Sequence, residues 1–527
     1  MTTAAVFHYG IDHLTPAIAM AIADGTCQGR LNAAARKRIA VCQQRVTELA
    51  AGAAAVYGVN TGFGPLCTTR ISAADTRTLQ RNLIMSHASG MGETISVRLA
   101  KLMLILKAHA LSRGHSGVAV ATVERIIWHS ENNVIPLVPC HGSVGASGDL
   151  APLSHLFLPL IGLGLVQTGS ETRPASQVLE EAGLQPIHLG PKEGLALING
   201  TQFIAAHAVT AVQRLQHCLD LSDIAGAMSL EALSGSIRPF LAELHALRPH
   251  PGAQQVARRL TALLQDSRMV SSHAGCSRVQ DAYSLRCMPQ VHGASRQAWA
   301  HLHDAVEVEI NSVTDNPVIL DNGEAVSGGN FHGQPLALPL DYAAFAASEL
   351  GNIADRRVFL MLHGNDQGLP KLLLANTGLQ SGFMISQYTT AALACENKTL
   401  CFPASADSIP TSLGQEDHVS MGSISARKLH RILDNLERIL AVEFTCAAQG
   451  MDFRRPLRSS AILEAVHARI RCEIAHADGD RVFADDLARA ENLVRAGSLL
   501  ASAVQCAAEK HIDLDNDSQG RSGPQTR

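Results

Sequence analysis

The most informative stretch of the chain reads Gly142-Ser143-Val144-Gly145-Ala146-Ser147-Gly148-Asp149-Leu150. Glycine permits positive φ and close approach of the backbone, so this stretch predicts a tight, strained loop. An Ala-Ser-Gly tripeptide in such a loop can cyclise when the Gly148 amide nitrogen attacks the Ala146 carbonyl. Two waters leave, Ser147 becomes a dehydroalanine, and the product is a 4-methylidene-imidazol-5-one ring. Its methylene group is an electrophile that ordinary side chains do not provide.

For Ala-Ser-Gly alone, a plain Gly/Ser turn is the better interpretation, because short motifs recur by chance. Six further segments of the sequence favour the ring-forming interpretation over a plain turn. They combine Gly-rich loops with isolated polar and aromatic side chains, and loops of that kind often carry function. The segments are Tyr57 to Gly64, Ser86 to Gly90, Glu193 to Thr201, Gln280 to Cys287, Gly328 to Gly333 and Gln415 to Gly422.

In this order, the segments together with 142–155 resemble the aromatic amino acid ammonia-lyases, and histidine ammonia-lyases in particular. The resemblance runs from about residue 8 to about residue 510. It implies the mainly α aromatic ammonia-lyase fold and an electrophilic ring formed autocatalytically from Ala146, Ser147 and Gly148, without an external cofactor. It also implies a homotetramer whose active sites take residues from three subunits.

The resemblance assigns catalytic roles to three residues besides the tripeptide. Tyr57 matches the base that removes a β-proton, and Tyr283 lies near the electrophile in relatives. Glu416 matches a carboxylate that pairs with the substrate. A tyrosine base needs a pKa below its ordinary value of about 10, and we expect nearby cations such as Arg286 to lower it.

The remaining matched residues are expected to bind substrate. Arg286 can hold the α-carboxylate with two parallel hydrogen bonds. Asn199 contacts the substrate carboxylate and the ring in relatives. Gln280 orients groups around the electrophile, Phe331 packs beside the ring, and His87 lies in the segment that distinguishes substrates.

The substrate is predicted from two positions, His87 and Glu416. A neutral imidazole carries one donor and one acceptor, and a histidine with a carboxylate can pair with it. We therefore expect L-histidine to be converted to trans-urocanate and ammonia, with either the amine or the ring attacking the electrophile. The alternatives are a tyrosine or phenylalanine ammonia-lyase, an aminomutase, and a non-enzymatic helical assembly protein that has kept the fold.

Composition limits the class of protein. The 527 residues are 46% hydrophobic and 17% charged, with a net charge of -4, which predicts a large core and argues against binding to nucleic acid or a membrane surface. The first basic residue is Arg30, so no secretory signal is expected. Twelve cysteines without a C-x-x-C pair predict free thiols in the cytoplasm and no metal site.

Hydrophobic spacing predicts the domain organisation. Residues 1–200 are mixed, with helical patterns such as Leu79 to Ser86 between Gly-rich loops. Residues 201–510 predict a helical bundle, and the polar tail 511–527 is expected to be disordered. The helical patterns of the bundle lie at 203–235, 296–313, 337–362, 427–440 and 485–508.

Overall fold

The protein is described by a computed structural model, in which two compact units can be distinguished. Unit 1 comprises Met1–Gln213, Leu302–Asp341 and Pro403–Arg427, and unit 2 comprises Arg214–His301, Tyr342–Phe402 and Lys428–Arg527. The predicted tail falls mostly outside the described part of the chain. The structure describes residues 5–64, 67, 71–72, 75–276, 278–365 and 368–514.

The two units interleave along the sequence, whereas the sequence-based boundary near residue 200 divides the chain only once. Long helices are the reason, because four of them contribute residues to both units. These helices are α9 (Gln202–Ala232), α14 (Met288–Ile310), α15 (Gln334–His363) and α17 (Gly422–Asp452).

Unit 1 contains the strands, all of them short. β1 (Ala5–His8) pairs in parallel with β2 (Cys27–Arg30), and the other pairs are antiparallel. Three strands form one small sheet in the order β4, β6, β7. The remaining strands are β3 (Met91–Thr94), β4 (Val134–Pro136), β5 (Pro139–His141), β6 (Leu165–Thr168), β7 (Glu171–Pro174), β8 (Val318–Ile319) and β9 (Ala325–Val326).

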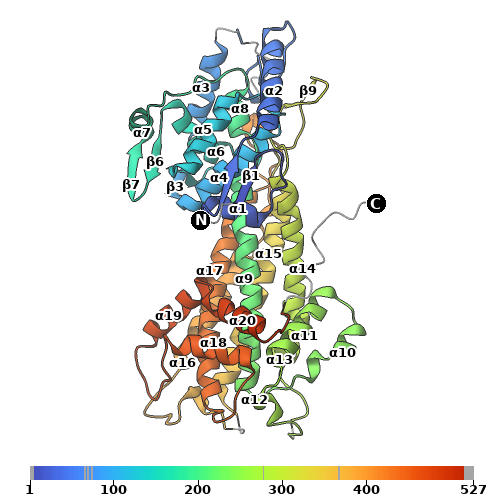
Figure 1. The fold of residues 1–527 in the computed structure, drawn as a ribbon, viewed down its shortest axis with the longest axis vertical. Coiled ribbons are helices and arrows are strands. Elements are labelled where there is room, and N and C mark those ends of the chain that lie inside the picture. The colour runs from blue at the N-terminus through green and yellow to red at the C-terminus, as the bar shows by residue number, and fades with distance from the viewer. Residues whose placement is uncertain are drawn as a thin grey trace. The chain divides into compact units, whose positions relative to one another are not determined.

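Helices α3, α6 and α8 of unit 1 pack against one another (Figure 1). This packing positions the site, because α3 ends at His87, α6 starts just after the tripeptide, and α8 ends just before Asn199. The helices of unit 1 are α1 (Pro16–Ala23), α2 (Ala33–Ala51), α3 (Thr76–His87), α4 (Val97–Ser112), α5 (Val120–Glu131), α6 (Leu150–Phe157), α7 (Ala175–Glu181) and α8 (Glu193–Ile198).

Helix α4 is enclosed on all sides. Ser96 caps its N-terminus by accepting a hydrogen bond from Leu99 N, and every residue from Leu99 to Ser112 is buried. A helix with apolar residues around its whole circumference belongs in a core. Lys107 lies within this buried stretch, so its ammonium group must find partners inside the protein.

Unit 2 is helical throughout its named elements (Figure 1). Besides the four long helices, its α-helices are α10 (Ala242–Ala246), α11 (Pro251–Leu263), α12 (Arg268–Ser271), α13 (Tyr283–Arg286), α16 (Met384–Leu400), α18 (Ala461–Arg471), α19 (Phe483–Arg495) and α20 (Ser498–Glu509). None of the helices in the described residues is long and apolar enough to cross a membrane.

The amphipathic pattern predicted at 427–440 is confirmed in α17, where all six apolar positions of the stripe, from Leu429 to Leu440, are fully buried. The single helical pattern predicted at 485–508 is instead two helices. Gly497 adopts φ +71° between α19 and α20, and this left-handed conformation ends one helix and starts the next.

Candidate active site

The tripeptide loop needs glycine on both sides of Ala146 and Ser147. Gly145 has φ +67° and Gly148 has φ +71°. A Cβ atom on Gly148 would lie 2.1 Å from Gly200 O, which leaves no room for a side chain. The sequence-based expectation of a tight turn at these positions is therefore confirmed.

Two distant segments hold the loop through its backbone oxygens. Gly333 N donates to Gly145 O at 3.2 Å, and Ser420 Oγ donates to the same oxygen at 3.0 Å. Met421 N donates to Val144 O at 2.8 Å. The backbone oxygens of the loop are thus hydrogen-bonded by parts of the chain that follow it by almost 200 residues or more.

Asp149 ties the loop to the first turn of α9. Its buried carboxyl accepts hydrogen bonds from Ser143 Oγ at 2.6 Å and from Phe203 N and Ile204 N at 3.0 Å each. Burial raises the pKa of Asp149 to about 6, while these hydrogen bonds lower it. The contact satisfies backbone donors that a helix N-terminus otherwise leaves unpaired.

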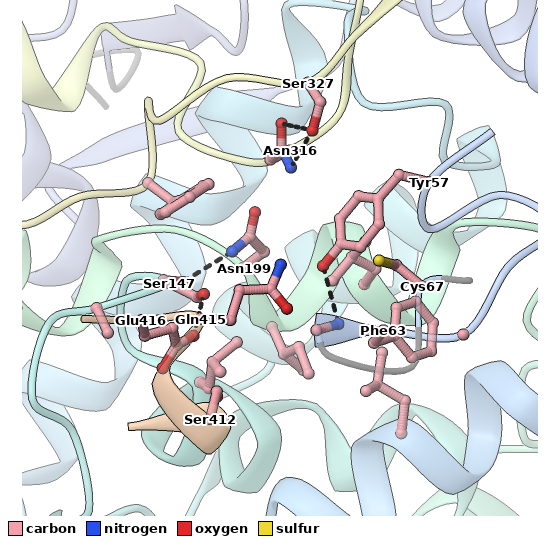
Figure 2. Close-up of a pocket in the computed structure, with 18 of the residues that line it drawn as sticks. Tyr57, Phe63, Cys67, Ser147, Asn199, Asn316, Ser327, Ser412, Gln415 and Glu416 are labelled. Atoms are coloured by element: carbon pink, nitrogen blue, oxygen red, sulfur yellow. Dashed lines mark hydrogen bonds between the residues drawn. The ribbon is translucent and has the colours of Figure 1, made fainter. Parts of the chain in front are cut away.

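Ser147 is contacted on both of its oxygens (Figure 2). Asn199 Nδ2 donates to the Ser147 carbonyl oxygen at 2.7 Å. The Ser147 hydroxyl donates to Glu416 Oε1 at 2.5 Å, and Thr411 Oγ1 donates to Glu416 Oε2 at 2.6 Å. Asn199 and Glu416 were both predicted site residues, whereas Thr411 was not.

Lys107 also supports the site and was missed from the sequence. Its Nζ donates to Asn199 O at 2.6 Å, and the side chain is only 1% exposed. Burial lowers the pKa of Lys107 to about 7, with a smaller opposing effect from Asp315. A lysine inside an otherwise apolar helix was the available signal, because lysine is rarely buried without a partner.

Beside Ser147 lies a cavity of about 1450 Å³. Its walls come entirely from unit 1, from segments spread between residues 55 and 418. The cavity brings together most of the residues predicted from the sequence. Those that line it are Tyr57, His87, Ala146, Ser147, Asn199, Phe331 and Glu416.

Tyr57 faces this cavity with its hydroxyl, which accepts a hydrogen bond from Gly64 N at 3.3 Å (Figure 2). Burial raises the pKa of Tyr57, and the charges of Cys67 and Glu416 raise it further, against a lowering by Gly64 N. The expectation of a lowered pKa is wrong for the isolated chain. The physical reason is that, among the described residues, the charged groups acting on this hydroxyl are not cations.

His87 is the last residue of α3. Burial lowers its pKa, with smaller opposing effects from Leu83 and Glu416. Ser86 Oγ donates to Leu83 O and lies 3.0 Å from His87 Nδ1. A neutral imidazole has one donor and one acceptor nitrogen, so the His87 ring can make one contact of each kind.

Gln280, Tyr283 and Arg286 belong to unit 2 and are not part of the cavity lining. Tyr283 is 71% exposed, and the Arg286 guanidinium lies 4.6 Å from the centre of its ring. The buried Arg357 forms a two-point ion pair with Glu443 and donates to Ser284 O at 3.4 Å. This pair supports the short helix α13 that carries both predicted side chains.

Among the described residues, no group of three or more His, Cys, Asp or Glu side chains could hold a metal ion.

Residues 14–472 match the sequence model of a family described as aromatic amino acid lyase. The chain belongs to this family. A histidine ammonia-lyase from Sorangium cellulosum is 50% identical over 480 residues, covering 89% of this chain and 93% of the relative. The crystal structure of histidine ammonia-lyase from Trypanosoma cruzi is similar with a TM-score of 0.87 and 41% identity over 95% of both chains. The crystal structure of a tyrosine aminomutase from Streptomyces globisporus is similar with a TM-score of 0.89 and 32% identity, and the match covers 95% of this chain and 99% of that chain.

The sequence-based predictions of the family, the mainly α fold and lyase activity are confirmed by these comparisons. Enzymes of the aromatic amino acid lyase family generally use a self-formed 4-methylidene-imidazol-5-one. The surroundings of Ser147 fit such a ring. The positive φ of Gly148 suits the turn. Asn199 Nδ2 donates to the Ser147 carbonyl oxygen, and Asn199 Oδ1 is buried without a hydrogen bond among the described residues.

Proposed function

We propose that this lyase is a histidine ammonia-lyase that converts L-histidine to trans-urocanate and ammonia in the cytoplasm. The observation that carries the proposal is that His87 and Glu416 line the same cavity as Ser147. Relatives named histidine ammonia-lyase, 50% and 47% identical to this chain, support the same substrate.

The polar groups of the cavity suit an imidazole. His87 Nε2 can accept a hydrogen bond from one ring N–H, and the Glu416 carboxyl group offers a second polar partner. A benzene ring would satisfy neither group, and burying an ionised carboxylate against it costs a few kcal/mol or more. A phenol could pair with His87 but would gain little from Glu416.

We propose that the cofactor forms from Ala146, Ser147 and Gly148, and that Asn199 holds it through the Ser147 carbonyl oxygen. The ring supplies an electrophilic carbon that turns the substrate ammonium, a poor leaving group, into a good one. Asp149 and Gly145 keep the loop in place. Phe331 closes the cavity as an apolar wall that limits water around the reacting atoms.

Tyr57 is proposed as the base that accepts the β-proton of the substrate at its hydroxyl oxygen. Its raised pKa in the isolated chain requires a cation from elsewhere. We propose a homotetramer in which Arg286 and Tyr283 of a neighbouring subunit complete the cavity, with Gln280 orienting groups there. Arg286 would then lower the pKa of Tyr57 and bind the substrate carboxylate.

The size of the cavity and the exposure of Tyr283 support this assembly. A volume of about 1450 Å³ exceeds the 300–1,000 Å³ usual for small-molecule sites, which leaves space for side chains from another subunit. Tyr283 is 71% exposed on unit 2, and it would be buried by such a contact.

The test is to incubate one enzyme preparation with L-histidine, L-tyrosine and L-phenylalanine and to follow each product by its ultraviolet absorbance. We expect kcat/KM for phenylalanine to be lower than for histidine by at least about 10²-fold, because the polar groups would be left unpaired. A preference for tyrosine would assign His87 to the phenol and Glu416 to the amine. Formation of a β-amino acid without free ammonia would identify an aminomutase.

A further inference from the structure

The Ser147 hydroxyl is the group that must leave for the proposed ring to form, and a carboxyl group is placed directly on it. Glu416 Oε1 lies 2.5 Å from Ser147 Oγ, although the two residues are 269 positions apart in sequence (Figure 2). We infer that Glu416 is the general acid that dehydrates Ser147 during self-modification, in addition to its role toward the substrate. The inference rests on the proposed function, because it concerns how the proposed ring is made.

Thr411 sets the direction in which Glu416 can transfer a proton. Its hydroxyl donates to Oε2 at 2.6 Å, and its backbone N donates to Glu416 O at 2.9 Å. Oε1 accepts from the Ser147 hydroxyl, so protonation of the carboxyl group on Oε1 reverses this hydrogen bond and makes Glu416 the donor to Ser147 Oγ. The proton is therefore aimed at the leaving oxygen.

The opposite side of Ser147 is prepared for loss of its Cα proton. Asn199 Nδ2 and Gly200 N donate to the Ser147 carbonyl oxygen at 2.7 and 3.4 Å. Such donors stabilise negative charge that develops on the carbonyl as the neighbouring Cα–H bond breaks. Lys107 holds the backbone of Asn199 in place for this contact.

The step balances without an oxidant or reductant. The Cα proton of Ser147 passes to water, and the electrons of the Cα–H bond form the Cα–Cβ double bond. The Cβ–Oγ bond breaks as Glu416, in its acid form, gives its proton to Oγ. Ser147 loses one water and Glu416 is left as a carboxylate, which solvent protonates again.

Asp149 is the other carboxyl group near the tripeptide, and its geometry excludes it from this step. Oδ1 accepts from Ser143 Oγ, and Oδ2 accepts from two backbone N–H groups of α9. Both oxygens thus anchor the loop, and neither has a hydrogen bond to Ser147 among the described contacts. Glu416 has an oxygen on the Ser147 hydroxyl itself.

The experiment follows the intact mass of newly made full-length chain over time in a cell-free translation system. Ring closure removes about 18 Da and dehydration of Ser147 removes about another 18 Da. The first variant is Glu416→Gln, whose amide has nearly the same size as the carboxyl group but no acidic proton to give to Ser147 Oγ. The matched control is Tyr57→Phe. Tyr57 lines the same cavity but makes none of the described hydrogen bonds to Ser147.

We expect Glu416→Gln to accumulate the species lighter by about 18 Da and to dehydrate at least about 10²-fold more slowly than Tyr57→Phe. Equal dehydration rates in the two variants would overturn the inference. If Glu416→Gln does not fold, Glu416→Ala is tested with added formate, which should restore the second mass loss. Absence of rescue in a soluble variant also overturns it.

The same measurement separates this inference from the proposed function. Wild-type chain that never loses mass would reject the proposed ring and the inference with it. Wild-type and Glu416→Gln chains that both lose about 36 Da at equal rates would reject the role of Glu416 in dehydration alone.

Discussion

His129 makes the stability of the protein depend on pH in a way that one substitution can isolate. The side chain is 1% exposed, its Nδ1 donates to Val134 O at 2.9 Å, and its Nε2 is buried without a hydrogen bond among the described residues. Burial lowers its pKa from 6.5 to about 4, and Arg125 lowers it further. Folded His129 is therefore neutral at pH values where the unfolded chain already binds a proton.

The sign and size follow from linkage. As pH falls below 6.5, His129 becomes protonated in the unfolded state, whereas in the folded state it becomes protonated only near pH 4. The free energy of unfolding therefore decreases between these two pH values. At about 1.4 kcal/mol per pKa unit, the loss between pH 7 and pH 5 is roughly 2 kcal/mol. Asp149 and Glu231 act in the opposite direction, because burial raises their pKa values to about 6 and about 7.

The assay is urea denaturation at pH 7 and pH 5, at one protein concentration, for wild type, His129→Gln and the exposed control His188→Gln. Wild type and His188→Gln should each lose about 2 kcal/mol more than His129→Gln over this range. Asp149 and Glu231 are present in all three proteins, so their contribution to the pH dependence of stability drops out of the difference between variants. Parallel pH dependence in all three proteins would refute the reasoning.

Three further predictions concern turnover. Ser147→Ala should fold like wild type, lose nearly all activity and never show the second loss of about 18 Da, since no hydroxyl can leave; circular dichroism, activity and intact mass test this together. Tyr57→Phe should lower kcat by at least about 10²-fold with little change in melting temperature, because only the base is removed; near-full activity would assign the base elsewhere. Arg286→Lys should mainly raise KM, since an ammonium cannot replace the two-point contact of a guanidinium; an unchanged KM would remove Arg286 from carboxylate binding.

Much of the site could be predicted from the sequence because its parts lie within short, recognisable strings. His87, Ser147 and Glu416 were each chosen from such a string, and the structure brings them to one cavity. Their chemical roles stay predictions. Thr411 and Lys107 lie outside these strings, and their contacts to Glu416 and Asn199 are visible only in the folded chain.

The electrostatics of the site were less accessible from sequence. The expected lowering of the Tyr57 pKa depended on nearby cations such as Arg286, but Tyr57 and Arg286 belong to different units. Burial, which depends on the whole fold, has the opposite effect on this hydroxyl. At the C-terminus, a continuous apolar pattern hid the break at Gly497, because glycine is compatible with a helix and only its positive φ reveals the turn.

The hydrogen bonds from Gly333 and Met421 to the 142–148 loop also bear on when, during synthesis of the chain, the loop can be anchored. A ribosome adds about 5–20 residues per second, so the 269 positions between Ser147 and Glu416 take roughly 13–54 s to synthesise. During that interval the tripeptide lacks the segments that bend and hold it. Until residue 421 has been made, a nascent chain would therefore carry an ordinary serine, and the proposed electrophile would form only after that point.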